Sequence, residues 1–394
     1  MDYWPVLPPE MPLTGLQVFF LHDEHRPHAE DMPTLSSALL DRTFNCVYGS
    51  EENNDLLEFI GDRVLNFYTA ELVDTVKITR AHAATVAKVV SNNDTLGRIA
   101  YSLRLHRNGY TNLNAEDEHS IFRWDPMHGT RPPKVLADLF EAFVGTVYVK
   151  YGFPELKPWL DRVFKPIIKV ATGDYLATCH PVSIFGEPHE YPLDLLNVSM
   201  QERLLSRIKL DLKEIRNKCP RGIDCLPSKT RLGFIAHGKL QGEDAENIDL
   251  AGSLIDLWIC NISLELWPHY HHARTKAAHL FSHITKFVSS TRILALVAYT
   301  YSLYDLYEEP TDPHSAQSRV QVNSDPFGWS SDELAYMFKY TAGWMFNKNP
   351  EEAHKWGRIV LRHIIKRTHD TLIENPSYMP SFHSHMSYRP RIYI

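Results

Sequence analysis

Two short segments of the sequence each carry a pair of carboxylates at helical spacing. In LLEFIGDRVL, Glu58 and Asp62 are four residues apart, and in KVLADLFEAFVGTVY, Asp138 and Glu141 are three apart. A helix places such neighbours on one face, one turn above the other. The same spacing is common on solvated helix faces, so neither pair alone establishes a site.

Four carboxylates brought together by two packed helices would form a site for hard divalent cations. The acids repel one another unless a cation lies between them, and oxygen ligands of this kind prefer Mg²⁺, or Mn²⁺, to softer metals. One such ion can convert a bound water into a nucleophile, and a second, about 4 Å away, can stabilise the departing oxygen of a phosphodiester. The two pairs therefore indicate metal-dependent phosphodiester hydrolysis.

The elements that must position these acids are helices. Residues 56–76 and 134–151 are long, apolar-rich and free of proline, and strand-type alternation is rare throughout the chain. We therefore expect an all-α fold. Gly61 and Gly145 lie inside these two segments, where glycine costs about 1 kcal/mol relative to alanine, so we expect both to mark close helix contacts.

The sequence also repeats itself. Residues 90–105 resemble residues 288–303 at an offset of 198, the same offset relates 136–145 to 334–343, and 52–72 resemble 246–266 at an offset of 194. Two copies of one helical domain explain this pattern, with chance similarity between Leu/Ala-rich helices as the alternative. We predict a proline-rich lead-in (1–13), a first domain (14–172), a linker (173–193), a second domain (194–375) and a C-terminal tail (376–394).

The length and charge of the chain limit the functional classes. A chain of 394 residues is longer than one core usually supports. A formal net charge of -7 argues against a generally basic nucleic-acid coat, unless basic residues gather locally or acids occupy a metal site.

The sequence indicates no membrane segment and no secretory signal, because its apolar runs are short and its start is neither basic nor apolar. The five cysteines are scattered without a CxxC pair, which favours a reducing compartment, the cytoplasm or the nucleus.

The residues around the acids resemble a known family. NDLLEFIGDRVL, residues 54–65, is similar to the ribonuclease III signature, with Asp55 in place of the usual Glu, Leu56 where a basic residue is common, and Ile60 for Leu. PPKVLADLFEAFVGTVYVKYG resembles the second acidic motif of the family, and NNDTLGRIA resembles its Ser-Asn-Glu-Thr-Leu helix. The resemblance covers residues 5 to about 168, and the proline-rich opening is similar to fungal members.

The resemblance implies an endonuclease that cuts double-stranded RNA to 5′-phosphate and 3′-hydroxyl ends with Mg²⁺. It implies that the metal-binding catalytic set is Glu58, Asp62, Asp138 and Glu141, and that Lys134 and Asn92 contact the substrate. A lone Lys is more often a solvated charge, and an Asn at the head of a helix is more often a cap. The alternative function is a non-catalytic RNA-binding or assembly protein with a ribonuclease III fold, similar to certain mitochondrial ribosomal subunits, which characteristically lose these acids.

The second copy lacks the acidic set. Asp138 and Glu141 correspond to Tyr336 and Lys339. In one register Glu58 and Asp62 correspond to Gly252 and Asp256, and in a rival register that aligns the glycines they correspond to Asp249 and Ser253. We therefore expect chemistry in the first domain only, with the two ribonuclease III-like domains packed as an intramolecular pseudo-dimer. A homodimer through the first domain is the alternative.

Other candidate sites are weaker. His279 and His283 have the spacing of a zinc site within the His-rich stretch 269–283, but no Cys or acid completes it. Cys219 and Cys225 have no His at finger spacing. We find no double-stranded-RNA-binding module after either copy, which predicts a separate RNA-binding partner.

Overall fold

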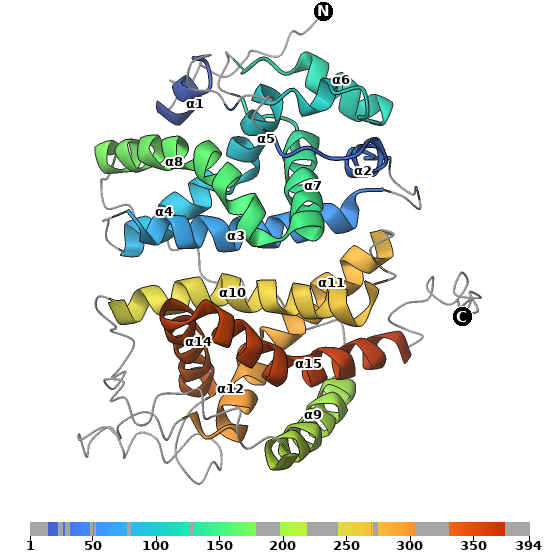
Figure 1. Cartoon of the computed structure of the whole chain (residues 1–394), viewed down its shortest axis with the longest axis vertical. Coiled ribbons are helices and arrows are strands. Elements are labelled where there is room, and N and C mark those ends of the chain that lie inside the picture. The colour runs from blue at the N-terminus through green and yellow to red at the C-terminus, as the bar shows by residue number, and fades with distance from the viewer. Residues whose placement is uncertain are drawn as a thin grey trace, which may run out of the picture. The chain divides into compact units, whose positions relative to one another are not determined.

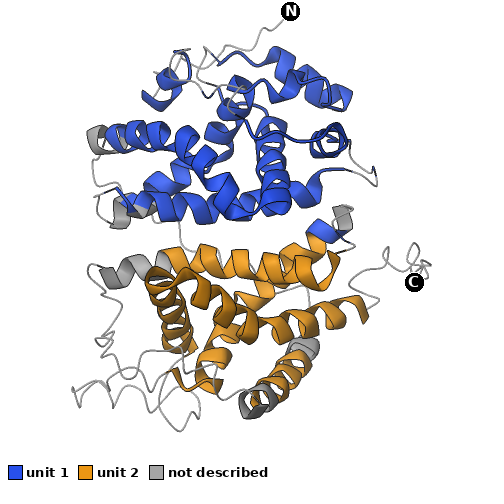
Figure 2. Cartoon of the chain, viewed as in Figure 1, with its two compact units in different colours: residues 1–185, 270–278 blue, residues 186–269, 279–394 orange. Residues whose placement is uncertain are grey.

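The chain folds into two compact units, which Figure 2 distinguishes by colour. The computed structural model describes residues 15–22, 27, 32–47, 50, 53–76, 80–126, 130–178, 198–218, 243–268, 270, 275–303 and 331–374. Unit 1 comprises Met1–Phe185 and Tyr270–Ala278, and unit 2 comprises Gly186–His269 and His279–Ile394. The predicted lead-in, the tail and most of the linker lie outside the described residues, so the exact domain boundaries stay predictions.

Unit 1 is built from helices. They are α1 (Gly15–Phe19), α2 (Ser37–Thr43), α3 (Asp55–Asp74), α4 (Arg80–Val90), α5 (Asn93–Ser102), the 3₁₀ turn η3 (Leu105–Arg107), α6 (Ala115–Arg123), α7 (Lys134–Tyr151) and α8 (Phe153–Thr178). Among the residues described, extended pairing is limited to an isolated bridge between Asn45 and Asn112. The all-α prediction is confirmed for this part of the chain.

Helix α7 forms the centre of unit 1, where α2, α3, α5 and α8 pack around it (Figure 1). Every residue from Val135 to Val147 is buried except Asp138. A helix that is apolar on nearly all sides lies in a core, where acidic residues are unusual and need a structural or functional reason. Phe140 of α7 packs against Trp159 of α8, with ring centroids 5.9 Å apart.

Two glycines allow α3 and α7 to touch along their backbones. A Cβ atom at Gly61 would lie 1.8 Å from the backbone oxygen of Glu141, and one at Gly145 would lie 2.1 Å from that of Leu57. Neither position has room for any side chain. The prediction that both glycines mark close helix contacts is confirmed, and the contact brings the acids of the two helices together.

Unit 2 repeats this arrangement. Its helices are α9 (Val198–Lys218), α10 (Glu243–Leu266), α11 (Thr275–Val288, which belongs to unit 2 from His279 onward), α12 (Thr291–Thr300), α14 (Ser331–Lys348) and α15 (Pro350–Glu374). Helix α14 packs against α10, α12 and α15, as α7 packs against α3, α5 and α8. Phe338 packs on Trp356, with centroids 5.2 Å apart, at the positions that Phe140 and Trp159 occupy in unit 1. The internal repeat in the sequence therefore corresponds to a repeat of helix packing.

The burial pattern of α10 does not by itself fix how this helix aligns with α3. Gly252 and Ser253 are half-buried and the next two residues are buried, a pattern shared by residues 58–61 and by residues 62–65 of α3. A Cβ atom at Gly252 would meet nothing within 4 Å, unlike one at Gly61. Gly252 therefore does not make the close backbone contact that Gly61 makes, and which residue of α10 corresponds to Glu58 stays a prediction.

No helix in the described part of the chain has both the length and the apolar character needed to cross a membrane.

Candidate metal centre

Helix α3 presents Glu58 and Asp62 on its half-buried side. Asn54 immediately precedes the helix, and its side-chain amide donates to the backbone oxygen of Thr43 at 3.1 Å and contacts the Cys46 sulfur at 3.3 Å. Leu56 and Ile60 are fully buried on the opposite side. These contacts orient the first turn of α3, from which Glu58 faces the acids of α7.

Helix α7 contributes the second pair of acids. It begins at Lys134, directly after Pro133. Asp138 is the one residue of its central stretch that is not fully buried, and Glu141, one turn further along, is 7% exposed. A carboxylate this deeply buried is rare unless a cation or hydrogen-bond donors compensate it.

Three of the four predicted acids converge. Glu58, Asp138 and Glu141 each offer a carboxylate oxygen, and these oxygens all lie within 4.8 Å of one another. Asp62 lies outside this set, and its Oδ1 accepts a hydrogen bond from Asn66 Nδ2 at 2.9 Å. The donor set is entirely carboxylate, which suits Mg²⁺ or Mn²⁺, so the residues fit the ion that the sequence predicts.

Burial first, and then neighbouring negative charges, raise the pKa values of the three carboxyl groups. Burial, and then the charge of Asp138, raises the pKa of Glu58 to about 7. Burial, followed by the charges of Asp62 and Glu58, raises the pKa of Glu141 well above its usual range. Burial also raises the pKa of Asp138, against the opposing effect of Lys134. A divalent cation would remove this mutual repulsion.

Lys134 lies at the edge of the acidic group. Its ammonium is 3.3 Å from Glu58 Oε1 and 2.5 Å from Asp138 Oδ1, and its side chain is 64% exposed. It therefore partly neutralises the cluster while remaining accessible from solvent. Its contact with substrate stays a prediction.

Asn92 has a clear structural task. Its side-chain oxygen accepts a hydrogen bond from the Thr95 backbone N–H at 2.9 Å and so caps α5. Asn92 is therefore a helix cap, one of the two roles expected for it. Substrate binding by Asn92 stays a prediction.

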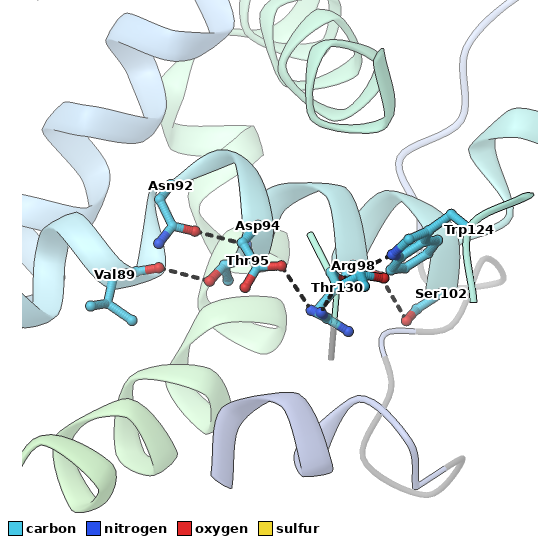
Figure 3. A network of polar contacts seen from close by, with 8 residues as sticks. All are labelled: Val89, Asn92, Asp94, Thr95, Arg98, Ser102, Trp124 and Thr130. Atoms are coloured by element: carbon cyan, nitrogen blue, oxygen red, sulfur yellow. Dashed lines mark hydrogen bonds and ion pairs between the residues drawn. The ribbon is translucent and has the colours of Figure 1, made fainter. Parts of the chain in front are cut away.

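A buried arginine connects α5 to the segment that precedes Lys134 (Figure 3). Arg98 is 2% exposed. It donates from Nε to Asp94 Oδ1 at 3.0 Å and from Nη2 to the Thr130 backbone oxygen at 2.9 Å. Its guanidinium lies over the Trp124 ring, and the Trp124 indole N–H donates to the same Thr130 oxygen at 3.1 Å.

These contacts hold the start of α7 in place. Pro132 packs so close to Gly97 of α5 that a Cβ atom there would lie 2.7 Å from Pro132 Cγ. The segment from Thr130 to Pro133 is thus attached to α5 at two points, directly before Lys134. Sequence reasoning missed Arg98, for which the only signal was an i,i+4 spacing from Asp94.

The equivalent positions of unit 2 carry no acidic cluster. In the register that places Gly252 at the position of Glu58, Asp256 is the one acid that remains, with Tyr336 and Lys339 at the positions of Asp138 and Glu141. Among the residues that the structure describes, a group of acids able to hold a metal ion is present in unit 1 alone.

The weaker candidates gain little support. Burial, and then Lys286, lowers the pKa of His283 to about 4, and His279 is exposed. His269, His271, His272, Cys219 and Cys225 lie outside the described residues. Burial raises the pKa of the Cys46 thiol to about 12, so this cysteine is a poor nucleophile.

The raised pKa of Glu58 predicts how stability depends on pH in EDTA. In the unfolded chain this carboxyl loses its proton near pH 4.5, but in the folded chain it keeps the proton until about pH 7. The folded state binds more protons in this window, so stability falls as the pH rises through it. Melting temperatures of the native chain should fall more steeply between pH 4.5 and 7 than those of Glu58→Gln. Identical dependence of melting temperature on pH in the two proteins would contradict the raised pKa of Glu58.

Fold and site together define an all-helical domain with a carboxylate cluster that could hold a metal ion at the contact of two core helices. Residues 31–167 match the model of the family described as Ribonuclease-III-like. Ribonuclease 3 of Francisella tularensis subsp. holarctica is 27% identical over 121 residues, covering 30% of this chain and 48% of that protein. Ribonuclease 3 of Variovorax paradoxus is 30% identical over 158 residues, covering 39% of this chain and 60% of that protein.

These matches support the ribonuclease III family for the region that holds the acids. The chain spans about half the length of the curated relatives it matches. That the second unit belongs to the same family, in a tandem arrangement of fungal type, stays a prediction.

Proposed function

We propose that this chain is a metal-dependent endoribonuclease that cleaves double-stranded RNA to 5′-phosphate and 3′-hydroxyl ends, with its site in unit 1 only. The observation that carries the proposal is the convergence of Glu58, Asp138 and Glu141 within 4.8 Å, in the region that matches the Ribonuclease-III-like family. The alternative, a non-catalytic RNA-binding or assembly protein, gives no reason to keep acids that repel one another inside a helical core.

Each residue has a proposed role. Glu58, Asp138 and Glu141 would hold Mg²⁺, with Mn²⁺ as a substitute, and the bound ion would supply an activated water and stabilise the leaving oxygen. Asp62 adds negative charge beside Glu141 and completes the catalytic set of four. The ammonium of Lys134, exposed at the edge of the cluster, would pair with a phosphate oxygen of the substrate. Asn92 would contact RNA from the start of α5.

Unit 2 would serve as a packing partner and an RNA-contact surface. We propose that the two units form a pseudo-dimer, so that one chain has one competent site and nicks one strand of a duplex. A homodimer through unit 1 would instead have two sites and make paired cuts. We further propose a separate RNA-binding partner that supplies affinity, and a location in the cytoplasm or nucleus.

Variants of unit 2 should leave the chemical step unchanged. Asp256→Asn and Lys339→Ala alter the positions that correspond to Asp62 and Glu141, where no carboxylate cluster exists. Single-turnover cleavage of a duplex RNA in Mg²⁺ should proceed within about twofold of the native rate, as expected for side chains remote from the chemistry. A loss comparable to that caused by Glu141→Gln, in a variant that still folds, would place chemistry in unit 2.

A further inference from the structure

Helix α15 of unit 2 carries a stripe of positive charge. Lys355, Arg358, Arg362 and Lys366 are separated by three, four and four residues, which places them on one face of the helix. The first three side chains are 66%, 55% and 43% exposed, and Lys366 is also exposed. We call these four residues the basic stripe.

Acids neutralise the basic stripe only in part. Residues 353–369 include no Asp or Glu. Glu265 of α10 pairs with both Arg358 and Arg362, so one carboxylate faces two guanidinium groups. Glu352 lies 3.8 Å from Lys355, an exposed contact of the kind that contributes little. Positive charge therefore remains along the whole face.

The fold itself does not require the stripe. Trp356 of α15 and Trp159 of α8 occupy equivalent places, so the stripe corresponds to positions 158, 161, 165 and 169 of α8. Those positions hold Pro158, Asp161, Lys165 and Lys169, and therefore include an acid. The two helices share their buried face but not this charge pattern. Packing alone does not explain the stripe.

The dimensions of the stripe suit a straight polyanion. From Lys355 to Lys366 it extends about 16 Å, at 1.5 Å per residue. A nucleic-acid duplex presents one negative charge per about 1.7 Å of its axis, or roughly nine charges over that length. The net charge of -7 would repel a polyanion, so binding to one requires a local cluster of positive charge such as this stripe.

The stripe favours a duplex over a single strand. Proteins that bind single strands stack bases on exposed aromatic rings. Trp356, the one aromatic residue within the stripe's span apart from histidines, is 1% exposed and packs on Phe338. The exposed apolar residue beside the stripe is Ile359, which cannot stack.

We propose that the basic stripe of α15 binds the phosphate backbone of double-stranded RNA. The choice of RNA as the polyanion rests on the proposed function. The binding surface itself is inferred from the exposed basic side chains of α15. The stripe would hold a duplex through the non-catalytic unit, independently of the metal centre.

The test is duplex binding by the full chain carrying Glu141→Gln, measured by fluorescence anisotropy in Mg²⁺ from 50 to 200 mM salt. Lys355→Gln with Lys366→Gln removes two charges and leaves the Glu265 pairs intact. It should weaken binding at least about tenfold and lower the slope of log affinity against log salt by about two. The charge-preserving pair Lys355→Arg with Lys366→Arg should keep both values near those of the parent.

The matched control is Lys165→Gln with Lys169→Gln on the equivalent face of α8, which should change affinity less than twofold. An unchanged affinity and slope in the stripe variant, an equal loss in the α8 control, equal affinity for single-stranded RNA, or no duplex binding would each overturn the proposal. Because binding is measured in an inactive background, a native chain that binds but does not cleave would contradict the proposed function alone.

Discussion

Glu141→Gln is expected to abolish Mg²⁺-dependent RNA cleavage while raising the melting temperature in EDTA. The substitution preserves the shape of the side chain but removes a negative charge that is 7% exposed and faces Asp62 and Glu58. A buried charge that is repelled by its neighbours destabilises the fold, so its removal should stabilise unit 1. The same charge is needed to hold the ion, so activity and stability should move in opposite directions.

Thermal unfolding in EDTA and in Mg²⁺, together with single-turnover cleavage, measures both effects. The native chain should gain about 2.7 kcal/mol at an Mg²⁺ concentration one hundred times the dissociation constant, and the variant much less. Asp256→Asn, the control in unit 2, should behave like the native chain in both assays. Native-like cleavage by Glu141→Gln would remove Glu141 from the site.

Gly61→Ala is expected to disrupt unit 1. The new Cβ atom would lie 1.8 Å from the backbone oxygen of Glu141, and α7 cannot move away without disturbing the core on its other sides. Overpacking of this kind typically costs 1–3 kcal/mol, and contact with backbone places it at about 3 kcal/mol or more. For a domain of this size that corresponds to a drop in melting temperature of roughly 6–12 °C.

Gly252→Ala is the matched control, because a Cβ atom there meets nothing within 4 Å. Replacing this helical glycine by alanine should be neutral or stabilise the chain by up to about 1 kcal/mol. Calorimetry should therefore show a lower melting temperature for Gly61→Ala and an unchanged or higher one for Gly252→Ala. Equal destabilisation would mean that the glycine-aligned register, in which Gly252 makes the close contact, is correct.

The central helices and their acids could be predicted because local spacing encodes them. Four-residue and three-residue separations place each pair of carboxylates on one face, and a glycine in the middle of each helix marks the crossing. The separation of Asp62 from the other three acids could not be predicted, since it depends on the orientation of a side chain that accepts from Asn66.

Contacts between residues far apart in the chain could not be predicted from the sequence. The anchoring of Thr130 by Arg98 joins residues 32 positions apart through a backbone oxygen, which leaves no pattern in the sequence. The equivalence of Trp159 and Trp356 was missed for a simpler reason: their separation of 197 differs by one from the offset of the preceding helix. A one-residue change at the turn between helices is enough to hide a repeated core residue.

We propose that unit 1 contains a single Mg²⁺-dependent RNA-cutting site. The most direct measurement is incubation of the native chain with a duplex RNA labelled separately on each strand, in Mg²⁺ and in EDTA, followed by analysis of the product ends. We predict cleavage in Mg²⁺ only, as nicks in one strand with 5′-phosphate and 3′-hydroxyl ends. An intact duplex in Mg²⁺, or cleavage that persists in EDTA, would contradict the claim.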